Sequence, residues 1–274
     1  MKKSIAMLLA LALCFALVAC ASAETKPTTA PTTAPTTAPT TAPTEKPTEP
    51  KETEPQATEP VALEYVEVTQ AQELLDAFAS PFSGAYKLMN DITIPAGTLV
   101  KIFCSINLDL NGFVLTIEQD TANSNVISIA GDYEPTTLTV EDNSEAGTGV
   151  LRALITKNGA GRSFIRCNIV GGIPNHFVLK SGTLEYATAE GVTSVNSKIL
   201  LFHVTEADAS ATVEGGKVIC NIAGATLKNP GDGKHNKAPV INGGLISIDP
   251  TEFLGEGKTA TQETVDGQTF WKVG

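Results

Sequence analysis

A corner containing glycine recurs between short apolar runs, and it restricts the fold of this chain more than any other feature. Gly182, Gly215 and Gly243 mark three such corners, 33 and 28 residues apart. Intervals of this size are typical of supersecondary units that stack as coils. Glycine suits the corners because it reaches positive φ and leaves room for a neighbouring coil. The segments that share this form are Asn111-Gly112-Phe113-Val114-Leu115, Ser181-Gly182-Thr183-Leu184-Glu185-Tyr186, Glu214-Gly215-Gly216-Lys217-Val218 and Asn242-Gly243-Gly244-Leu245-Ile246.

Short apolar runs, separated by turns rich in Gly, Asn, Asp and Pro, fill the chain after Ser80. Such runs predict strands, and alone they fit a sandwich, a barrel or a solenoid equally well. The glycine repeat favours the solenoid, in which each coil buries its inner face against its neighbours and both ends need covers. The predicted strands are 92–94, 100–110, 113–117, 126–129, 138–140, 150–153, 164–170, 177–179, 199–204, 218–222 and 245–248.

One segment before these strands has helical periodicity. Thr69 and Gln72 have the spacing of a capping box, which satisfies free backbone groups at a helix N-terminus. An apolar face follows at helical spacing, formed by Ala71, Leu74, Leu75 and Phe78. We therefore expect one short amphipathic helix that covers the N-terminal end of the coils.

The stretch from Met1 to Ala23 has the organisation of an export signal. Lys2 and Lys3 precede an apolar stretch from Ile5 to Ala19, and small residues follow. The apolar stretch has about 15 residues, fewer than the roughly 20 of a membrane-spanning helix. We expect this segment to direct export and not to remain as a transmembrane span.

Within this signal, Leu17-Val18-Ala19-Cys20 resembles the lipobox of bacterial lipoproteins. The resemblance implies that residues 1–20 are a lipoprotein-type signal peptide, that Cys20 carries a diacylglyceryl thioether, and that the acyl chains anchor the protein in a membrane. The alternative is ordinary cleavage after Ala21-Ser22-Ala23, which has the A-x-A form and would release a secreted protein.

Residues 21–62 have the composition of a disordered linker. Thr-Thr-Ala-Pro repeats between Thr28 and Pro43, and Glu-Pro pairs continue to Pro60. Regular prolines fix φ and remove backbone donors, so we expect an extended spacer with a reach on the order of 100 Å. The Thr pairs leave O-glycosylation open. Residues 63–274 are the part that we expect to fold.

The formal net charge of −11 argues against a nucleic-acid partner. Phosphate backbones are bound by clustered Lys and Arg side chains, and no such cluster is visible along the sequence. For the same reason we do not expect a polyanionic partner.

Three segments resemble the pectate-lyase-like right-handed parallel β-helices that occur as repeats in bacterial surface proteins. They are Leu108-Asp109-Leu110-Asn111-Gly112-Phe113, Leu138-Thr139-Val140-Glu141-Asp142-Asn143-Ser144 with Gly147 and Gly149, and Ile241-Asn242-Gly243-Gly244-Leu245-Ile246-Ser247-Ile248-Asp249-Pro250. In the last segment Ile246 stands where an aromatic residue is usual. The resemblance covers about Tyr65 to Val273 and implies an all-β solenoid with a short N-terminal capping helix. Its motifs are structural, so it implies a fold and not an activity.

Polysaccharide lyases of this fold use clustered Asp residues for calcium and a Lys or Arg as base, and no such set is visible here. Catalytic carboxylates for glycoside hydrolysis could still assemble across coils, because roughly 5–10 Å corresponds to one or two strand spacings. We therefore predict no catalytic residue from the sequence. The scattered candidates are Asp91, Asp109, Asp120, Asp132, Asp142, Arg152, Arg162 and Arg166.

The acidic turn 141–145, with Asp132 and Glu134, offers oxygen atoms of the kind that calcium prefers. It lacks the alternation and fixed glycine of a dedicated calcium loop, so we interpret it as a solvated turn with Asx hydrogen bonds. His176, His203 and His235 are far apart and lack neighbouring ligands. The sequence predicts no metal site and no cofactor.

Three cysteines fall in the part expected to fold, Cys104, Cys167 and Cys220, each within a strand-like run. We interpret them as apolar packing residues, with a single disulfide as the alternative. Sugar binding needs exposed aromatic rings, and aromatic residues make up only 5% of the chain. The candidates are Tyr133, Tyr186, Phe202 and Trp271, of which Trp271 is interpreted as a cover for the C-terminal end of the coils.

An export signal, a long spacer and a domain without a visible catalytic set suit presentation better than turnover. We expect a monomeric binding or adhesion module on the outer face of the cell envelope, directed at a glycan or a surface protein. The alternatives are an extracellular polysaccharide lyase or glycoside hydrolase and a purely structural spacer. The sequence does not identify the ligand-binding residues.

Overall fold

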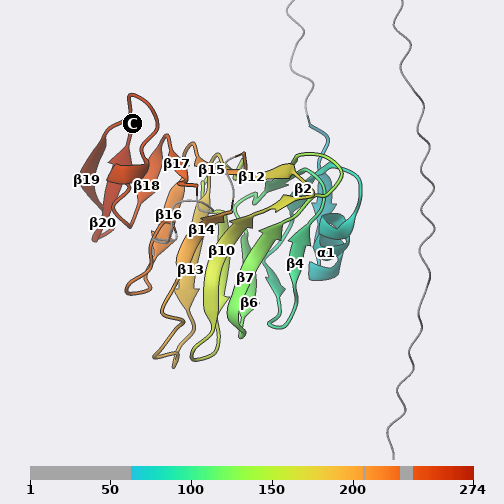
Figure 1. The fold of residues 1–274 in the computed structure, drawn as a ribbon, viewed down its shortest axis with the longest axis horizontal. Helices are drawn as coiled ribbons and strands as arrows, with labels where there is room; N and C mark the ends of the chain where they lie inside the picture. The colour runs from blue at the N-terminus through green and yellow to red at the C-terminus, as the bar shows by residue number, and fades with distance from the viewer. Residues whose placement is uncertain (1–62, 206–207, 229–236) are drawn as a thin grey trace, which may run out of the picture. The chain divides into compact units, whose positions relative to one another are not determined.

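The computed structural model describes residues 63–205, 208–228 and 237–274, which are mostly β-strands in parallel sheets (Figure 1). The mostly-β expectation is confirmed for these residues. The predicted signal peptide with Cys20, the linker and His235 lie outside the described residues.

Helix α1 (Ala71–Ala79) is the predicted amphipathic helix, with Leu74, Ala77 and Phe78 buried. Its cap lies one residue later than expected. Gln70 is the N-cap, and the carboxylate of Glu73 accepts hydrogen bonds from the amides of Thr69 (2.8 Å) and Gln70 (3.1 Å). The predicted Thr69–Gln72 box is therefore wrong, because the charged Glu73 side chain binds these amides instead.

After α1 the chain passes through three sheets in turn, which we name sheets A, B and C. Sheet A has the order β1-β2-β5-β8-β12-β15-β17, all paired in parallel. Its strands are β1 (Val66–Val68), β2 (Gly84–Leu88), β5 (Ile106–Asp109), β8 (Thr136–Glu141), β12 (Ile173–Leu179), β15 (Ser210–Val213) and β17 (Val240–Ile241). The short strand β11 (Ile169–Val170) pairs with β12 in the antiparallel sense.

Sheets B and C are built from the strands between those of sheet A. Sheet B continues in parallel through β3 (Ile92–Ile94), β6 (Val114–Gln119), β9 (Val150–Ile155), β13 (Thr183–Thr188), β16 (Lys217–Cys220) and β18 (Gly244–Ile246). Sheet C has the order β14-β10-β7-β4, also parallel, from β4 (Val100–Ile102), β7 (Ala122–Ile129), β10 (Gly161–Cys167) and β14 (Leu200–Val204).

Register places apolar side chains of successive passes on top of one another. In sheet A, Leu138 pairs with Ile106 on one side and Phe177 on the other. All three side chains are buried. Alternate residues of a strand face opposite sides, so each strand contributes every second side chain to a shared interior. Rings from different sheets meet there: Phe177 of sheet A lies 5.9 Å from Phe202 of sheet C, centroid to centroid.

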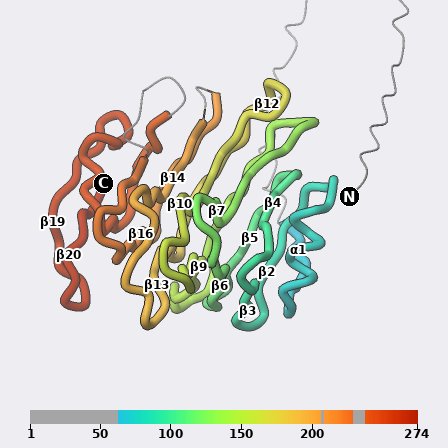
Figure 2. The backbone as a smooth tube through the Cα atoms, turned by 60° about the horizontal axis from the view of Figure 1, so that its bottom comes forward, coloured from blue at the N-terminus to red at the C-terminus, as the bar shows by residue number. Residues whose placement is uncertain are grey.

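The two ends of this part of the chain are covered differently. Helix α1 packs against β3 and β4, and the amide of Phe103 donates to the carbonyl of Phe78 (3.3 Å). At the other end, β19 (Ala260–Val265) and β20 (Gln268–Val273) form an antiparallel hairpin, and β20 pairs antiparallel with β18. Figure 2 shows α1 and this hairpin at opposite ends, with the coloured backbone running between them. The 3-10 helix η1 (Thr251–Phe253) precedes the hairpin.

The predicted corners lie where the chain leaves sheet A for sheet B. Gly182 has the expected positive φ of 77°, but at the other two corners the positive φ falls one residue later than predicted, on Gly216 (75°) and Gly244 (99°). The predicted strand 100–110 is wrong as a single element, because the chain turns between Ile102 and Ile106 to pass from sheet C to sheet A. The run 164–170 is likewise divided between β10 and β11.

Candidate functional site

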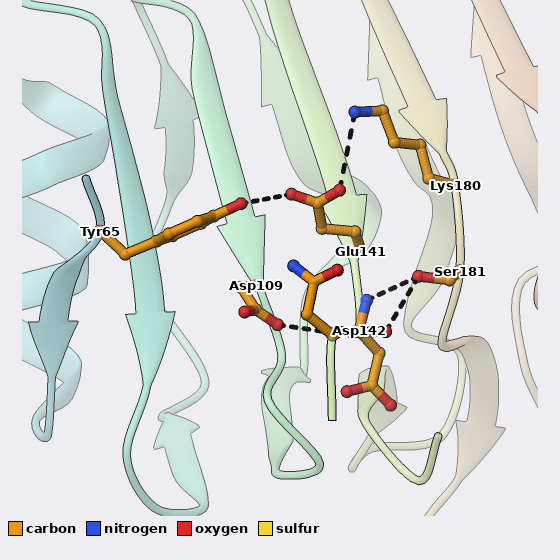
Figure 3. A network of polar contacts seen from close by, with 7 residues as sticks. Tyr65, Asp109, Glu141, Asp142, Lys180 and Ser181 are labelled. Atoms are coloured by element: carbon orange, nitrogen blue, oxygen red, sulfur yellow. Dashed lines mark hydrogen bonds and ion pairs between the residues drawn. The ribbon is translucent and has the colours of Figure 1, made fainter. Parts of the chain in front are cut away.

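Residues of the acidic turn after β8 belong to a network of polar contacts at the corner (Figure 3). Asp142 is only 8% exposed, and its carboxylate accepts hydrogen bonds from the amides of Gly112 (2.8 Å), Ser144 (3.1 Å) and Gly149 (2.6 Å). Burial alone raises the pKa of Asp142, but these hydrogen bonds outweigh it and hold the pKa below its ordinary value. The predicted Asx bond is confirmed, and most of the turn is solvated as predicted, with Asn143 and Glu145 exposed, but Asp142 itself is buried.

Two further carboxylates of this region also have hydrogen-bond or ion-pair partners within the protein. Asp109 accepts from the amides of Asn111 (2.9 Å) and Asn143 (3.0 Å). Glu141 accepts from the hydroxyl of Tyr65 and lies 3.6 Å from the ammonium of Lys180, as Figure 3 shows. Burial, followed by the bond to Glu141, raises the pKa of the Tyr65 phenol. Among the residues that the structure describes, no three His, Cys, Asp or Glu side chains are grouped to hold a metal ion.

Asp132 and Glu134 lie apart from this turn and line a cavity of about 410 Å³. We name it the aromatic pocket, because its other lining residues include exposed aromatic rings; it is formed by Ala79, Pro81, Phe103, Asp132, Tyr133 and Glu134. Tyr133 is 90% exposed and Phe103 is 39% exposed. The pocket therefore combines flat apolar surface with two carboxylates in a position open to solvent.

The other aromatic candidates for sugar binding are in different surroundings. Tyr186 and Phe202 are buried in the interior, and the Tyr186 ring lies 5.4 Å from that of Phe164. The suggestion that Tyr186 or Phe202 binds a sugar is therefore wrong. Trp271 is half-buried in the C-terminal hairpin, opposite Ile246 of β18. Only Tyr133 of the four is a broadly exposed ring.

The cysteines behave as packing residues. Cys104 and Cys167 are buried in the core cluster, and Cys220 is half-buried against it. All three are free thiols. Burial raises the pKa of Cys220 to about 11, so this thiol is a poor nucleophile at neutral pH. The packing interpretation is confirmed, and the disulfide alternative is wrong.

The scattered arginines separate into two groups. Arg152 in sheet B forms an ion pair with Glu185 of the next strand, with 2.6 Å between Nε and Oε2. Arg166 instead pairs in register with Ser128 and His203, and Ser128 pairs with Lys101. We name these four residues, Lys101, Ser128, Arg166 and His203, the cationic row. Sequence reasoning missed it, since the four positions come together only through the register of sheet C.

One signal in the sequence does mark the cationic row. Each member stands between two apolar residues, as in Ile165-Arg166-Cys167 and Phe202-His203-Val204. A polar residue in the middle of such a run faces away from its neighbours in a strand. Pairing four such runs side by side puts the four polar side chains on one face, but the sequence does not specify which runs pair.

Comparisons of the chain with protein-family models, with curated proteins and with solved structures found no match. No helix within the described ranges is long and apolar enough to cross a bilayer.

Proposed function

We propose that this protein is a binding module displayed on the outer face of a bacterial cell envelope, with a glycan as its ligand. The aromatic pocket is the observation that carries this proposal. Sugar rings stack their apolar faces on exposed aromatic side chains, and carboxylates accept hydrogen bonds from sugar hydroxyls. Tyr133, Phe103, Asp132 and Glu134 offer both kinds of contact in one cavity.

The proposal includes a right-handed parallel β-helix as the platform of this pocket. Its support is the fixed order in which the chain visits sheets A, B and C, with parallel pairing between successive passes. Parallel crossover connections are right-handed in nearly all proteins. The resemblance to pectate-lyase-like domains points the same way. An experimental structure with antiparallel pairing throughout sheets A to C would overturn this part.

Attachment to the envelope is proposed through a lipid on Cys20, with residues 21–62 as the spacer and the folded part as a monomer. The test is incorporation of labelled palmitate into the full chain and into Cys20→Ala. We expect label in the wild type and none in the variant, with the variant released into the medium. Equal release of both proteins without label would support ordinary cleavage after Ala23 and overturn the anchor.

The glycan proposal is tested by measuring binding of the full chain to an array of bacterial and host polysaccharides. We expect Tyr133→Ala to weaken binding about fivefold or more, since the stacking of a nucleobase on an aromatic side chain contributes about 1–3 kcal/mol and a sugar face stacks in the same way. The control is Phe82→Ala, which removes another exposed ring that does not line the pocket. An unchanged affinity in Tyr133→Ala would exclude the pocket as the glycan site.

A polysaccharide-degrading enzyme is the second candidate, because Asp132 and Glu134 line the same pocket. Glycosidases cleave with a pair of carboxylates that face the scissile bond. Any polysaccharide that binds is therefore incubated with the protein, and new reducing ends or unsaturated products are measured. We expect binding without products. Products that disappear in Glu134→Gln but persist in the surface control Glu256→Gln would establish the enzyme instead.

A further inference from the structure

The cationic row crosses sheet C on one face. Lys101 pairs with Ser128, Ser128 with Arg166, and Arg166 with His203. Directly paired residues point to the same side of a sheet, and because neighbouring strands are about 4.8 Å apart, the four side chains follow one another over about 14 Å. Lys101 is exposed and Arg166 is half-buried, whereas Ser128 and His203 are only 6% and 8% exposed.

No carboxylate of the described residues neutralises this row. The ion pairs among the described residues join Arg152 to Glu185, Lys180 to Glu141 and Lys272 to Glu263. None of them includes a member of the cationic row. The lack of a carboxylate paired with the row is unexpected in a chain with 30 acidic residues against 19 basic ones. A further cation, Arg162, stands on the same strand as Arg166 and acts electrostatically on both Arg166 and His203.

Two polar atoms of the row are buried without a hydrogen-bond partner, Nε of Arg166 and Nδ1 of His203. A buried polar atom with no partner costs stability, and a native fold seldom keeps two beside each other. Burial, together with Arg166 and Arg162, lowers the pKa of His203 to about 4. His203 is therefore neutral at neutral pH, and the charge comes from Arg166, Arg162 and Lys101. These cations, with the unpaired Nε–H of Arg166 among them, are what a bound anion would satisfy.

We propose that the cationic row binds an oxyanion, a sulfate, phosphate or carboxylate group, held chiefly by the Arg166 guanidinium with His203 and Ser128 as hydrogen-bonding neighbours. Arginine presents its N–H groups in a planar fork that matches two oxygens of such a group. Ser128 supplies a hydroxyl on the next strand, and Lys101 adds charge at the exposed end. This inference does not depend on the glycan proposal, because it involves none of the residues that line the aromatic pocket.

The test is equilibrium dialysis of the full chain with radiolabelled inorganic sulfate, at constant ionic strength set with chloride. We expect saturable binding in the wild type, with unlabelled phosphate and acetate as competitors that rank the three oxyanion classes. Arg166→Gln is expected to weaken binding at least tenfold, and Lys101→Gln about threefold, because Lys101 is exposed and its charge is screened by solvent. The matched controls Arg152→Gln and Lys258→Gln remove the same charges elsewhere and should leave binding unchanged.

Thermal unfolding without oxyanion gives a second readout that a purely structural role would not produce. Removing Arg166 ends its charge repulsion with Arg162 and removes an unpaired buried donor. We therefore expect Arg166→Gln to raise Tm by about 2–4 °C. A structural role predicts a lower Tm. The site would be overturned if chloride displaced sulfate as well as phosphate and acetate do. Sulfate binding that persists at full strength in Arg166→Gln would also overturn it. A lower Tm together with unchanged sulfate binding would do the same.

Discussion

The corner between sheets A and B is built in two different ways along the chain. In its N-terminal part, carboxylates stabilise the corner. Asp109 and Asp142 accept hydrogen bonds from backbone amides of their own turn and of the adjacent one. In its C-terminal part, the pairs Gly215–Gly216 and Gly243–Gly244 form the corner with hardly any side chain. The same change of direction is therefore achieved by hydrogen bonding at one end and by close backbone packing at the other.

The difference lies in what surrounds each glycine. A Cβ added at Gly215 would lie 2.6 Å from the carbonyl oxygen of Lys180, and one at Gly244 would lie 2.5 Å from that of Gly216. At Gly112, in the N-terminal part, the nearest atoms belong to the Ser144 side chain, at 3.2 Å. Backbone cannot move aside as a side chain can. The C-terminal corners therefore tolerate no side chain, whereas the N-terminal corners depend on particular ones.

The largest effect should come from Gly216→Ala. Its Cβ would meet the carbonyl oxygen of Gly182, and φ is already 75°. We expect a loss of about 4 kcal/mol or more in the free energy of unfolding, as for other severe backbone clashes. Gly112→Ala, with φ 82°, should cost clearly less, and Gly97→Ala, with open space around it, only about 1–2 kcal/mol. Urea unfolding measures all three; equal losses would remove the distinction between the two kinds of corner.

Asp142→Ala should have the next largest effect, because it leaves the amides of Gly112 and Gly149 without their acceptor. Each unpaired buried amide costs about 1–3 kcal/mol, so we expect a total loss of about 3 kcal/mol. Asp120→Ala is the control, since among the described residues Asp120 accepts a hydrogen bond only from its neighbour Thr121. A loss no larger than that of the control would mean that water replaces the carboxylate and that the corner does not need it.

The glycine corners could be predicted from the sequence because they repeat, and a repeated Gly-Gly between apolar runs indicates a turn packed closely against other backbone. The carboxylate corners could not be predicted from the sequence. Gly149, whose amide closes the turn, lies seven residues after Asp142, and nothing in 141–145 distinguishes amide binding from calcium binding. The outcome depends on which amides of the preceding turn come within reach, and that is decided by register.

The same limit applies to the two candidate sites. Tyr133 was one of four aromatic candidates, and the sequence did not separate it from Tyr186 and Phe202, which are buried. The partner of Tyr133 in the aromatic pocket, Phe103, lies 30 residues earlier and joins it only through folding. The cationic row is the extreme case, with four residues from four strands of sheet C. The sequence supplied the residue types, whereas their assembly across strands was not predictable from it.

The pH dependence of stability should distinguish the carboxylate corners from the glycine corners. The pKa of Asp142 is lowered in the folded protein, so its contribution to stability is complete above its unfolded pKa of about 3.9 and is lost as pH falls through the folded pKa. We expect the wild type to lose stability below about pH 4 and Asp142→Ala to lose less over that range. The measurement is urea unfolding at pH 6, 4 and 3. Parallel pH profiles for the two proteins would show that Asp142 is not the titrating group.

The smallest effect is expected where one kind of corner can be converted into the other. Ser181 precedes Gly182, and its hydroxyl accepts from the amide of Asp142 (2.8 Å) and donates to the carbonyl of Asp142 (3.2 Å). Ser181→Gly creates the Gly-Gly pair of the C-terminal corners and removes both bonds. We expect a loss of about 1–2 kcal/mol, from the hydrogen bonds and the added freedom of the unfolded chain. Ser181→Ala separates these causes, because it removes the same bonds without adding that freedom. A loss near zero in both variants would mean that close backbone packing alone suffices at this corner.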